Sequence, residues 1–213
     1  MGGPHPSGMT LTDPTPSPPS RPERIVLGQD ESILIVPGFL SPEECEAFIR
    51  LTEARGYRDA PVTTFRGFVM RPDIRNNTRV MIDDEALAAR LWARMEPFVP
   101  AVCEGWRACG LNERFRYYRY QPGQYFKSHS DGAYFRSVRE ESLYTAMVYL
   151  NEGFGGGSTD FQDGPFITPR QGLLLLFKHP LRHQGSAVTH GCKYVLRTDV
   201  KYRQPPQPSS ENS

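Results

Sequence analysis

The chain has 213 residues, with 25 Lys and Arg against 24 Asp and Glu, so its formal net charge is +1. This balance argues against a nucleic-acid binder or a polybasic membrane-surface protein, because both depend on excess positive charge. Since the sequence has no apolar run of the roughly 18 residues that span a membrane, no signal-peptide pattern and only scattered cysteines, we expect a cytoplasmic protein with free thiols.

The two ends of the chain differ in composition from its centre. Residues 1–22 are rich in Gly, Pro, Ser and Thr, and residues 204–213 are rich in Pro, Ser and Gln. Such segments bury too little apolar surface to compensate for the entropy lost on ordering. We therefore expect two disordered tails around one domain, residues 24–203.

The first half of this domain predicts a strand followed by two helices. Residues 33–36 form a short apolar run typical of a strand. Ser41 and Glu44 then have the spacing of a capping box, and apolar residues at helical spacing continue to Gly56. A second helix is expected over residues 84–97, because apolar residues there recur three or four positions apart.

From residue 114 the pattern changes to short strands. We expect them at residues 115–120, 143–150, 158–162, 173–177 and 193–202. Pro-Gly, Gly-Gly-Gly and Asp-Gly-Pro stretches between them mark turns. Helices followed by many short antiparallel strands predict an α+β, mainly β domain that closes into a sandwich or jelly-roll barrel.

Histidine and aspartate residues in this second half suggest a metal site. On an extended segment His129 and Asp131 point to the same side, so both side chains can contact one ion. With a second histidine they form a facial triad of two His and one carboxylate, which is typical of non-haem Fe(II) oxygenases. His179, His183 and His190 are the candidates for that ligand. Taken alone, His129 and Asp131 could also be a surface histidine beside an aspartate in a turn.

Five segments, taken in order along the sequence, favour the interpretation of these residues as metal ligands. They resemble the YxxGxxYxxHxD, TxxxYLN, GGxTxF, PxxGxxLLF and HxGxxVxxGxK stretches of the prolyl 4-hydroxylase-like Fe(II)/2-oxoglutarate-dependent dioxygenases. These segments are residues 119–131, 145–151, 156–161, 169–177 and 183–193. The resemblance implies a double-stranded β-helix (jelly-roll) core at about 114–203 with flanking N-terminal helices, and it selects His183 as the second histidine ligand.

The resemblance also implies Fe(II), O2 and 2-oxoglutarate, with ascorbate as reductant. Lys193 has the family position for the cation that binds the distal carboxylate of 2-oxoglutarate. Arg197 lies on the same face of the predicted strand and is the alternative. Tyr120, Tyr149 and Thr159 fall where the family hydrogen-bonds this cosubstrate, although core packing explains the two tyrosines equally well.

Candidate substrate contacts lie in two further segments. In related hydroxylases the segment before the barrel borders the substrate cleft, which makes Arg75, Asn77 and Arg79 candidates for recognising an anion or an amide. A solvated loop is the alternative. Arg136 lies in residues 132–142, a candidate lid.

These residues together predict an enzyme. By resemblance it hydroxylates an unactivated C–H bond of a peptide, an amino acid or a small metabolite and releases succinate and CO2. A non-catalytic jelly-roll binding module and a metal-dependent, cupin-like hydrolase are the alternatives. We expect no nucleic-acid or membrane partner, and the sequence leaves the substrate and the oligomeric state open.

Overall fold

A computed structural model of the chain describes residues 22–64 and 67–205. Residues 1–21 and 206–213, which make up nearly all of the two predicted tails, lie outside the described residues. Within the described ranges, no helix is long and apolar enough to cross a membrane. The four cysteines are free thiols, as the sequence indicated, and they are Cys45, Cys103, Cys109 and Cys192.

The first helix, α1 (Pro42–Arg55), begins and ends where local signals place it. The Ser41 hydroxyl accepts from the Glu44 N–H, and the Glu44 carboxylate accepts from the Ser41 N–H, so the predicted capping box forms. The helix ends at Gly56, whose positive φ of 76° favours glycine.

The second helix, α2 (Glu85–Met95), is shorter than predicted by about one turn. Asp84 caps its N-terminus, and residues Glu96–Phe98 form a separate 3-10 turn. Its apolar side packs against the main sheet through the buried residues Leu87, Ala88, Leu91 and Met95.

Six strands match the predicted ones to within three residues at either end. They are β2 (Ile33–Val36), β9 (Arg114–Tyr120), β12 (Glu140–Tyr149), β14 (Thr159–Phe161), β16 (Leu174–Lys178) and β19 (Lys193–Arg203).

The other strands have at most six residues, and the sequence did not predict them. They are β1 (Ile25–Val26), β3 (Arg58–Asp59), β4 (Val62–Thr64), β5 (Gly67–Val69), β6 (Thr78–Asp83), β7 (Val102–Cys103), β8 (Trp106–Leu111), β10 (Phe126–His129), β11 (Phe135–Ser137), β13 (Gly155–Gly156), β15 (Phe166–Ile167), β17 (His183–Gly185) and β18 (Val188–His190). β6 includes Arg79, one of the candidate substrate residues for which a solvated loop was the alternative.

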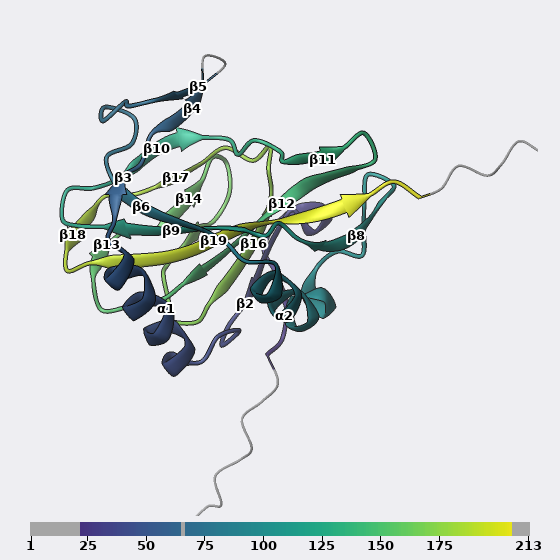
Figure 1. Ribbon diagram of the computed structural model, residues 1–213, viewed down its shortest axis with the longest axis horizontal. Helices are drawn as coiled ribbons and strands as arrows, with labels where there is room; N and C mark the ends of the chain where they lie inside the picture. The colour runs from purple at the N-terminus through teal and green to yellow at the C-terminus, as the bar shows by residue number, and fades with distance from the viewer. Residues whose placement is uncertain (1–21, 65–66, 206–213) are drawn as a thin grey trace, which may run out of the picture.

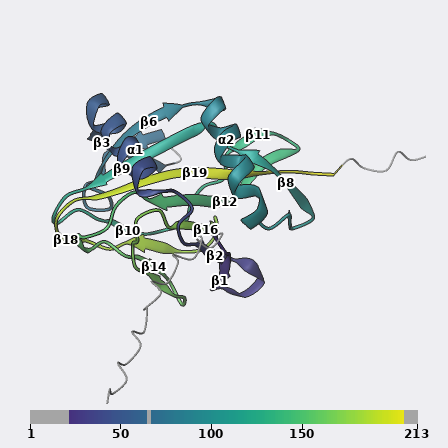
Figure 2. The same cartoon turned by 90° about the horizontal axis from the view of Figure 1, so that it is seen from below.

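The strands form a main sheet and a smaller sheet that covers one of its faces. The path of the main sheet is β1-β2-β16-β12-β19-β9-β6-β3, with β7, β8 and β11 attached at its side. The smaller sheet has the order β10-β17-β14-β15, and β13–β18 and β4–β5 form separate pairs. Helices α1 and α2 lie on the opposite face of the main sheet (Figures 1 and 2). The predicted α+β, mainly β jelly roll is therefore confirmed.

Strand alternation divides the core into two clusters, one on each face of the main sheet. Tyr117 and Leu196 belong to the cluster beneath the helices. Their neighbours Tyr118 and Val195 belong to the cluster between the two sheets. The second face also carries polar side chains, and these form the candidate site.

Candidate functional site

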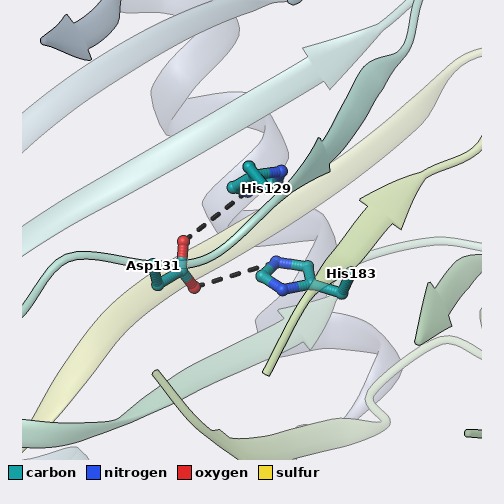
Figure 3. Close-up of side chains that lie close together, drawn as sticks. All are labelled: His129, Asp131 and His183. Atoms are coloured by element: carbon teal, nitrogen blue, oxygen red, sulfur yellow. Dashed lines mark ion pairs between the residues drawn. The ribbon is translucent and has the colours of Figure 1, made fainter. Parts of the chain in front are cut away.

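Two histidines and an aspartate meet between the two sheets (Figure 3). His129 ends β10, Asp131 follows it, and His183 begins β17, where it pairs directly with His129. Asp131 Oδ1 lies 3.6 Å from His129 Nε2, and Asp131 Oδ2 lies 3.8 Å from His183 Nε2. One ligand atom from each residue lies within 4.8 Å of the others. The structure thus brings together the three residues that the sequence proposed as metal ligands.

Both imidazoles are oriented by backbone carbonyls two residues before them. His129 Nδ1 lies 2.8 Å from the Lys127 carbonyl, and His183 Nδ1 lies 3.0 Å from the Leu181 carbonyl. Because a carbonyl only accepts, each Nδ1 carries a proton, and each Nε2 is the ring nitrogen that faces Asp131. Burial lowers the pKa of His183 to about 4, which keeps its imidazole neutral. Two imidazoles and one carboxylate are a donor set that fits Fe(II).

The Asp131 carboxylate is buried and held on both oxygens. The Thr145 hydroxyl donates to Oδ2 at 2.6 Å, and Arg197 Nη1 lies 3.0 Å from Oδ1. Burial raises the pKa of Asp131, but the opposing effects, of which the positive charge of Arg197 is the largest, hold that pKa well below its usual value. The carboxylate is therefore ionised, as a metal ligand must be.

The other two candidate histidines lie outside this group. His179 is buried, with Nδ1 3.1 Å from the Thr145 hydroxyl and Nε2 2.9 Å from the Ser142 hydroxyl, so both ring nitrogens are engaged. His190 is exposed at the end of β18. In the described part of the chain, no second group of three His, Cys, Asp or Glu residues brings its ligand atoms this close together.

The triad opens into a cavity between the sheets. Its lining residues are Tyr118, Tyr120, Phe126, His129, Asp131, Thr145, Met147, Thr159, Phe177, His183, Gly185, Lys193, Val195 and Arg197. Four of the five predicted cosubstrate residues are among them. The fifth, Tyr149, lies behind the wall, where its hydroxyl donates to Thr159 Oγ1 at 2.7 Å.

Within the described part of the chain, Lys193 is a buried cation with a single hydrogen-bond acceptor. Lys193 is 3% exposed, and its Nζ donates to the Gly157 carbonyl at 2.5 Å. Gly157 has a φ of 68°, and a Cβ there would lie 3.1 Å from Lys193 Cδ, so glycine permits this close approach. Burial lowers the pKa of Lys193 to about 7, although the nearby Asp160 carboxylate opposes this shift. A buried ammonium with unused donors fits a ligand carboxylate.

Arg197, the alternative cation, is already paired with acids. Besides its contact with Asp131, its Nη2 lies 3.5 Å from Asp199 Oδ1. Burial lowers the pKa of Arg197, but the Asp131 charge and the phenol of Tyr118 help to raise it above its usual value. Its charge is therefore committed to the carboxylates beside it.

Three of the four candidate substrate residues lie beside the cavity. Arg75 Nε donates to Asn77 Oδ1 at 2.7 Å, and the Arg75 guanidinium lies 4.4 Å from the ring centroid of Tyr118. Arg79 is opposite Tyr118 in the pairing of β6 with β9. The structure does not bring Arg136 to this group.

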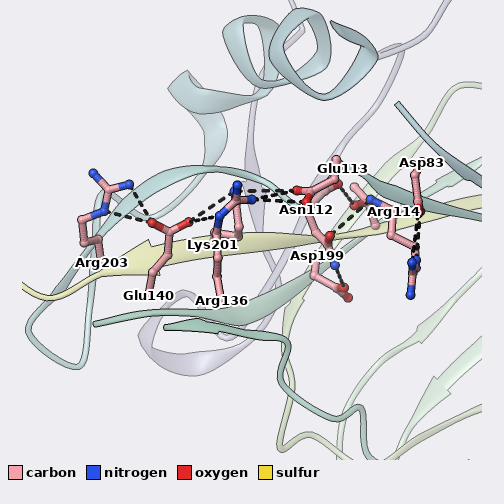
Figure 4. A network of polar contacts seen from close by, with 10 residues as sticks. Asp83, Asn112, Glu113, Arg114, Arg136, Glu140, Asp199, Lys201 and Arg203 are labelled. Carbon is pink, nitrogen blue, oxygen red and sulfur yellow. Dashed lines mark hydrogen bonds and ion pairs between the residues drawn. The ribbon is translucent and has the colours of Figure 1, made fainter. Parts of the chain in front are cut away.

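Arg136 belongs instead to a charged network at the far end of the main sheet (Figure 4). It lies on β11, and its guanidinium donates to Glu113 at 3.1 Å. Residues 132–142, the candidate lid, include this strand and the start of β12, with which it pairs. Arg136 is not among the residues that line the cavity with the triad, so the structure does not support its predicted role in substrate binding.

Two cavity residues with hydroxyl groups, Tyr118 and Thr145, were not predicted as site residues from the sequence. Tyr118 precedes Tyr120 by two positions on β9, so strand alternation places both on one face. Thr145 opens the TxxxYLN segment, and its hydroxyl contacts the aspartate of the triad. Alternation would have identified Tyr118, whereas the role of Thr145 depends on the pairing of distant strands.

Comparison with known proteins agrees with this geometry. Residues 115–198 match the family model of the 2OG-Fe(II) oxygenase superfamily. This segment contains the whole triad and both candidate cations. Fold, site and match together identify residues 115–198 as a 2OG-Fe(II) oxygenase segment, as the resemblance predicted.

Solved structures with the same fold include two microbial prolyl hydroxylases. A viral collagen prolyl hydroxylase from Paramecium Bursaria Chlorella virus-1, in complex with 2OG, is 22% identical with a TM-score of 0.56, over 80% of this chain and 96% of that one. A Pseudomonas putida prolyl-4-hydroxylase is 19% identical with a TM-score of 0.57, over 82% of this chain and 94% of that one.

A third similar structure contains a peptide. It is a prolyl hydroxylase from Trichoplax adhaerens in complex with a hypoxia inducible factor peptide fragment, 17% identical with a TM-score of 0.61, over 79% of this chain and 83% of that one. At these identities the likeness shows the fold. No curated protein gives a significant match to the chain.

Proposed function

We propose that the chain is an Fe(II)- and 2-oxoglutarate-dependent dioxygenase that hydroxylates an unactivated C–H bond of a peptide, an amino acid or a small metabolite. Succinate and CO2 are the products of its cosubstrate. The observation that carries this proposal is the presence, in one cavity, of the triad and of Lys193, a buried cation that pairs with no acid among the described residues. The 2OG and the peptide in two similar structures support it by analogy.

In this proposal the triad residues His129, Asp131 and His183 hold Fe(II). Their fixed tautomers and the ionised carboxylate supply the required donor set, and Thr145 and Arg197 hold the carboxylate in place. When bound, the iron supplies the redox chemistry that couples O2 and 2-oxoglutarate to hydroxylation, and ascorbate keeps it ferrous.

Lys193 binds the distal carboxylate of 2-oxoglutarate, because Arg197 is already committed to Asp131. Tyr120 and Thr159 line the same cavity and provide hydroxyl groups for this carboxylate. Tyr149 acts through Thr159, to which its hydroxyl donates. Met147, Val195 and Phe177 form apolar walls that limit the access of water.

Succinate formation from 2-oxoglutarate tests the proposal. The full chain is incubated with Fe(II), ascorbate and 2-oxoglutarate and with peptide, amino-acid or metabolite pools, and products are screened for the mass gain of one oxygen atom. His129→Ala and Asp131→Ala should reduce substrate-dependent succinate formation to background, because each removes a metal ligand. His190→Ala is the matched control, since that histidine is exposed and outside the triad.

The outcomes also separate the two alternatives. Full turnover by Asp131→Ala would exclude the triad as the metal site. Binding of 2-oxoglutarate without any succinate would favour the non-catalytic binding module. Binding of metal without 2-oxoglutarate would favour the hydrolase, in which Lys193 has no evident use.

A further inference from the structure

Arg75 is a buried cation with unused hydrogen-bonding capacity. The residue is 4% exposed, and its Nη2 has no hydrogen-bond partner within residues 22–64 and 67–205. Its guanidinium lies over the rings of Tyr118 and Phe126, at 4.4 and 4.5 Å from their centroids, and its Nε donates to Asn77. A charged donor that is buried and unpaired is unfavourable, so this rigid arrangement is suited to a ligand that completes it.

The guanidinium of Arg75 lies close to the metal centre. Both of these rings line the cavity that holds the triad. One of them, Phe126, stacks on the imidazole of His129 with ring centroids 3.5 Å apart. A group bound by Arg75 is therefore separated from the proposed iron ligand by a single aromatic ring.

Arg79 adds a second positive charge beside Arg75. In the main sheet it is opposite Tyr118 on one side and opposite Arg58 on the other. Two arginines directly opposite each other in an antiparallel pair repel. The contact of Arg79 is with the ring of Phe68 at 5.8 Å, and no acid of the described residues forms an ion pair with it. Burial and the charge of Arg75 contribute to lowering the pKa of Arg79. This agrees with a site whose positive charges are not neutralised by acids.

Apart from Lys193, two other cations on this face already pair with acids. Arg116 lies 3.0 Å from Asp199, and Arg197 lies 3.0 Å from Asp131. In the strand registers Tyr118 lies between Arg79 of β6 and Val195 of β19, so Arg79 and Lys193 lie on opposite sides of β9. The face thus has two separate places for an anion, and the cosubstrate accounts for only one.

We propose that Arg75 and Arg79 form a carboxylate-binding subsite for the primary substrate, which is therefore an acid. The acid is either a small carboxylic acid or a peptide with an acidic side chain near the hydroxylated position. Guanidinium groups suit carboxylates because their planar donors match the two oxygens. This inference rests on the proposed function, because the metal centre defines which ligand is the substrate.

Matched pairs of acids and amides test this subsite in the full chain. The protein is loaded with Co(II) and 2-oxoglutarate, so that binding is measured without turnover, and titrated by calorimetry. The small probes are N-acetylglutamate α-amide and its glutamine counterpart, and the peptide probes are capped peptides that differ only by Glu and Gln. We expect the acid of at least one pair to bind about tenfold or more tightly than its amide. Whether the small or the peptide pair shows this preference identifies the source of the carboxylate.

Variants assign the preference to individual residues. Arg75→Gln should abolish it and leave 2-oxoglutarate affinity unchanged, and Arg75→Lys should restore part of it, since lysine keeps the charge but not the planar fork. Arg79→Gln should reduce the preference for the acid. Because Arg79 is only half-buried, this variant still tests the subsite if Arg75→Gln fails to fold. Arg71→Gln is the control, because Asp73 already accepts from Arg71 at 2.8 and 2.7 Å.

The possible failures are distinguishable. If the wild-type chain binds neither Co(II) nor 2-oxoglutarate, the proposed function is wrong and the subsite falls with it. If it binds both, but acids bind no better than amides or no probe binds, the carboxylate subsite is overturned while the proposed function stands. If Arg75→Gln weakens 2-oxoglutarate as strongly as it weakens the acids, Arg75 belongs to the cosubstrate site and the inference is also overturned.

Discussion

Strand β19 carries two lysines in opposite electrostatic settings. Lys193, at its start, is buried with one carbonyl as acceptor and no acid of the described residues in ion-pair contact. Lys201, near its end, lies 3.3 Å from Glu140 and 4.0 Å from Glu113 (Figure 4). The charge at one end of the strand therefore pairs with acids, whereas the charge at the other end has no acidic partner among the described residues.

The network around Lys201 compensates its charges internally. The Glu140 side chain is 9% exposed and also accepts from Arg203 at 2.6 Å. Burial raises the pKa of Glu140, but its hydrogen bonds with Arg203 and Lys201 outweigh this effect and hold the pKa below its usual value. In the cavity, by contrast, burial dominates at Lys193 and no ion pair offsets it. A buried charge without an acidic partner is what the proposed carboxylate ligand would compensate.

Replacing Lys193 should have the largest effect. Lys193→Met is expected to weaken 2-oxoglutarate binding about 100-fold, because it leaves the distal carboxylate buried and unpaired. The same change should raise the thermal unfolding midpoint of the ligand-free protein, since it removes a buried ammonium without an acidic partner. Calorimetry with the Co(II)-loaded protein and thermal denaturation measure the two effects.

Lys201→Met is the matched control for that experiment. It should leave 2-oxoglutarate affinity unchanged and lower the unfolding midpoint, because Glu140 and Glu113 lose a partner. Equal losses of affinity in the two variants would contradict the distinction between the two ends of β19.

Removing the acid at the centre of the network should destabilise the fold. Glu140→Ala is expected to lower the free energy of unfolding by about 2 kcal/mol, because Lys201 and Arg203 lose their shared carboxylate. Chemical denaturation measures this change. Calorimetry should find 2-oxoglutarate affinity unaltered, and a large loss of affinity would show that the network also supports the cavity.

The pH dependence of cosubstrate binding should follow Lys193. Its pKa is about 7 in the ligand-free protein, and the bound carboxylate favours the protonated form. Affinity should therefore be highest below about pH 7 and fall about tenfold for each further pH unit. Calorimetry across this range measures the slope. Lys193→Arg, which remains charged, should remove the slope, and an unchanged slope in that variant would assign the titration to another group.

Local signals explain which parts of the fold were predictable. The capping box at Ser41 and the alternation along β19 act within a few residues, and both are visible in the sequence. Strands β10 and β17 have only four and three residues and mixed polarity, so their existence depends on pairing with each other. These two strands nevertheless position the predicted histidine ligands.

In the candidate site, too, the parts that depend on local signals were predictable and the parts that depend on strand pairing were not. His129 and Asp131 are two residues apart, so strand geometry alone brings them together. Thr145, by contrast, reaches Asp131 only because distant strands pair, and no local pattern encodes that pairing. Arg136 was expected near the substrate, yet β11 pairs with β12 and carries it to Glu113 instead.

The smallest effect is expected at the exposed rim of the network. The Arg203 side chain is 61% exposed, so water can replace its contact with Glu140 while Lys201 continues to pair with that carboxylate. Arg203→Gln should therefore leave the thermal unfolding midpoint unchanged within error, in contrast to Glu140→Ala. A double-mutant cycle of Arg203→Gln with Glu140→Gln measures the coupling directly. A midpoint drop as large as that of Glu140→Ala would mean that the exposed pair, and not the buried Lys201 contact, stabilises this end of β19.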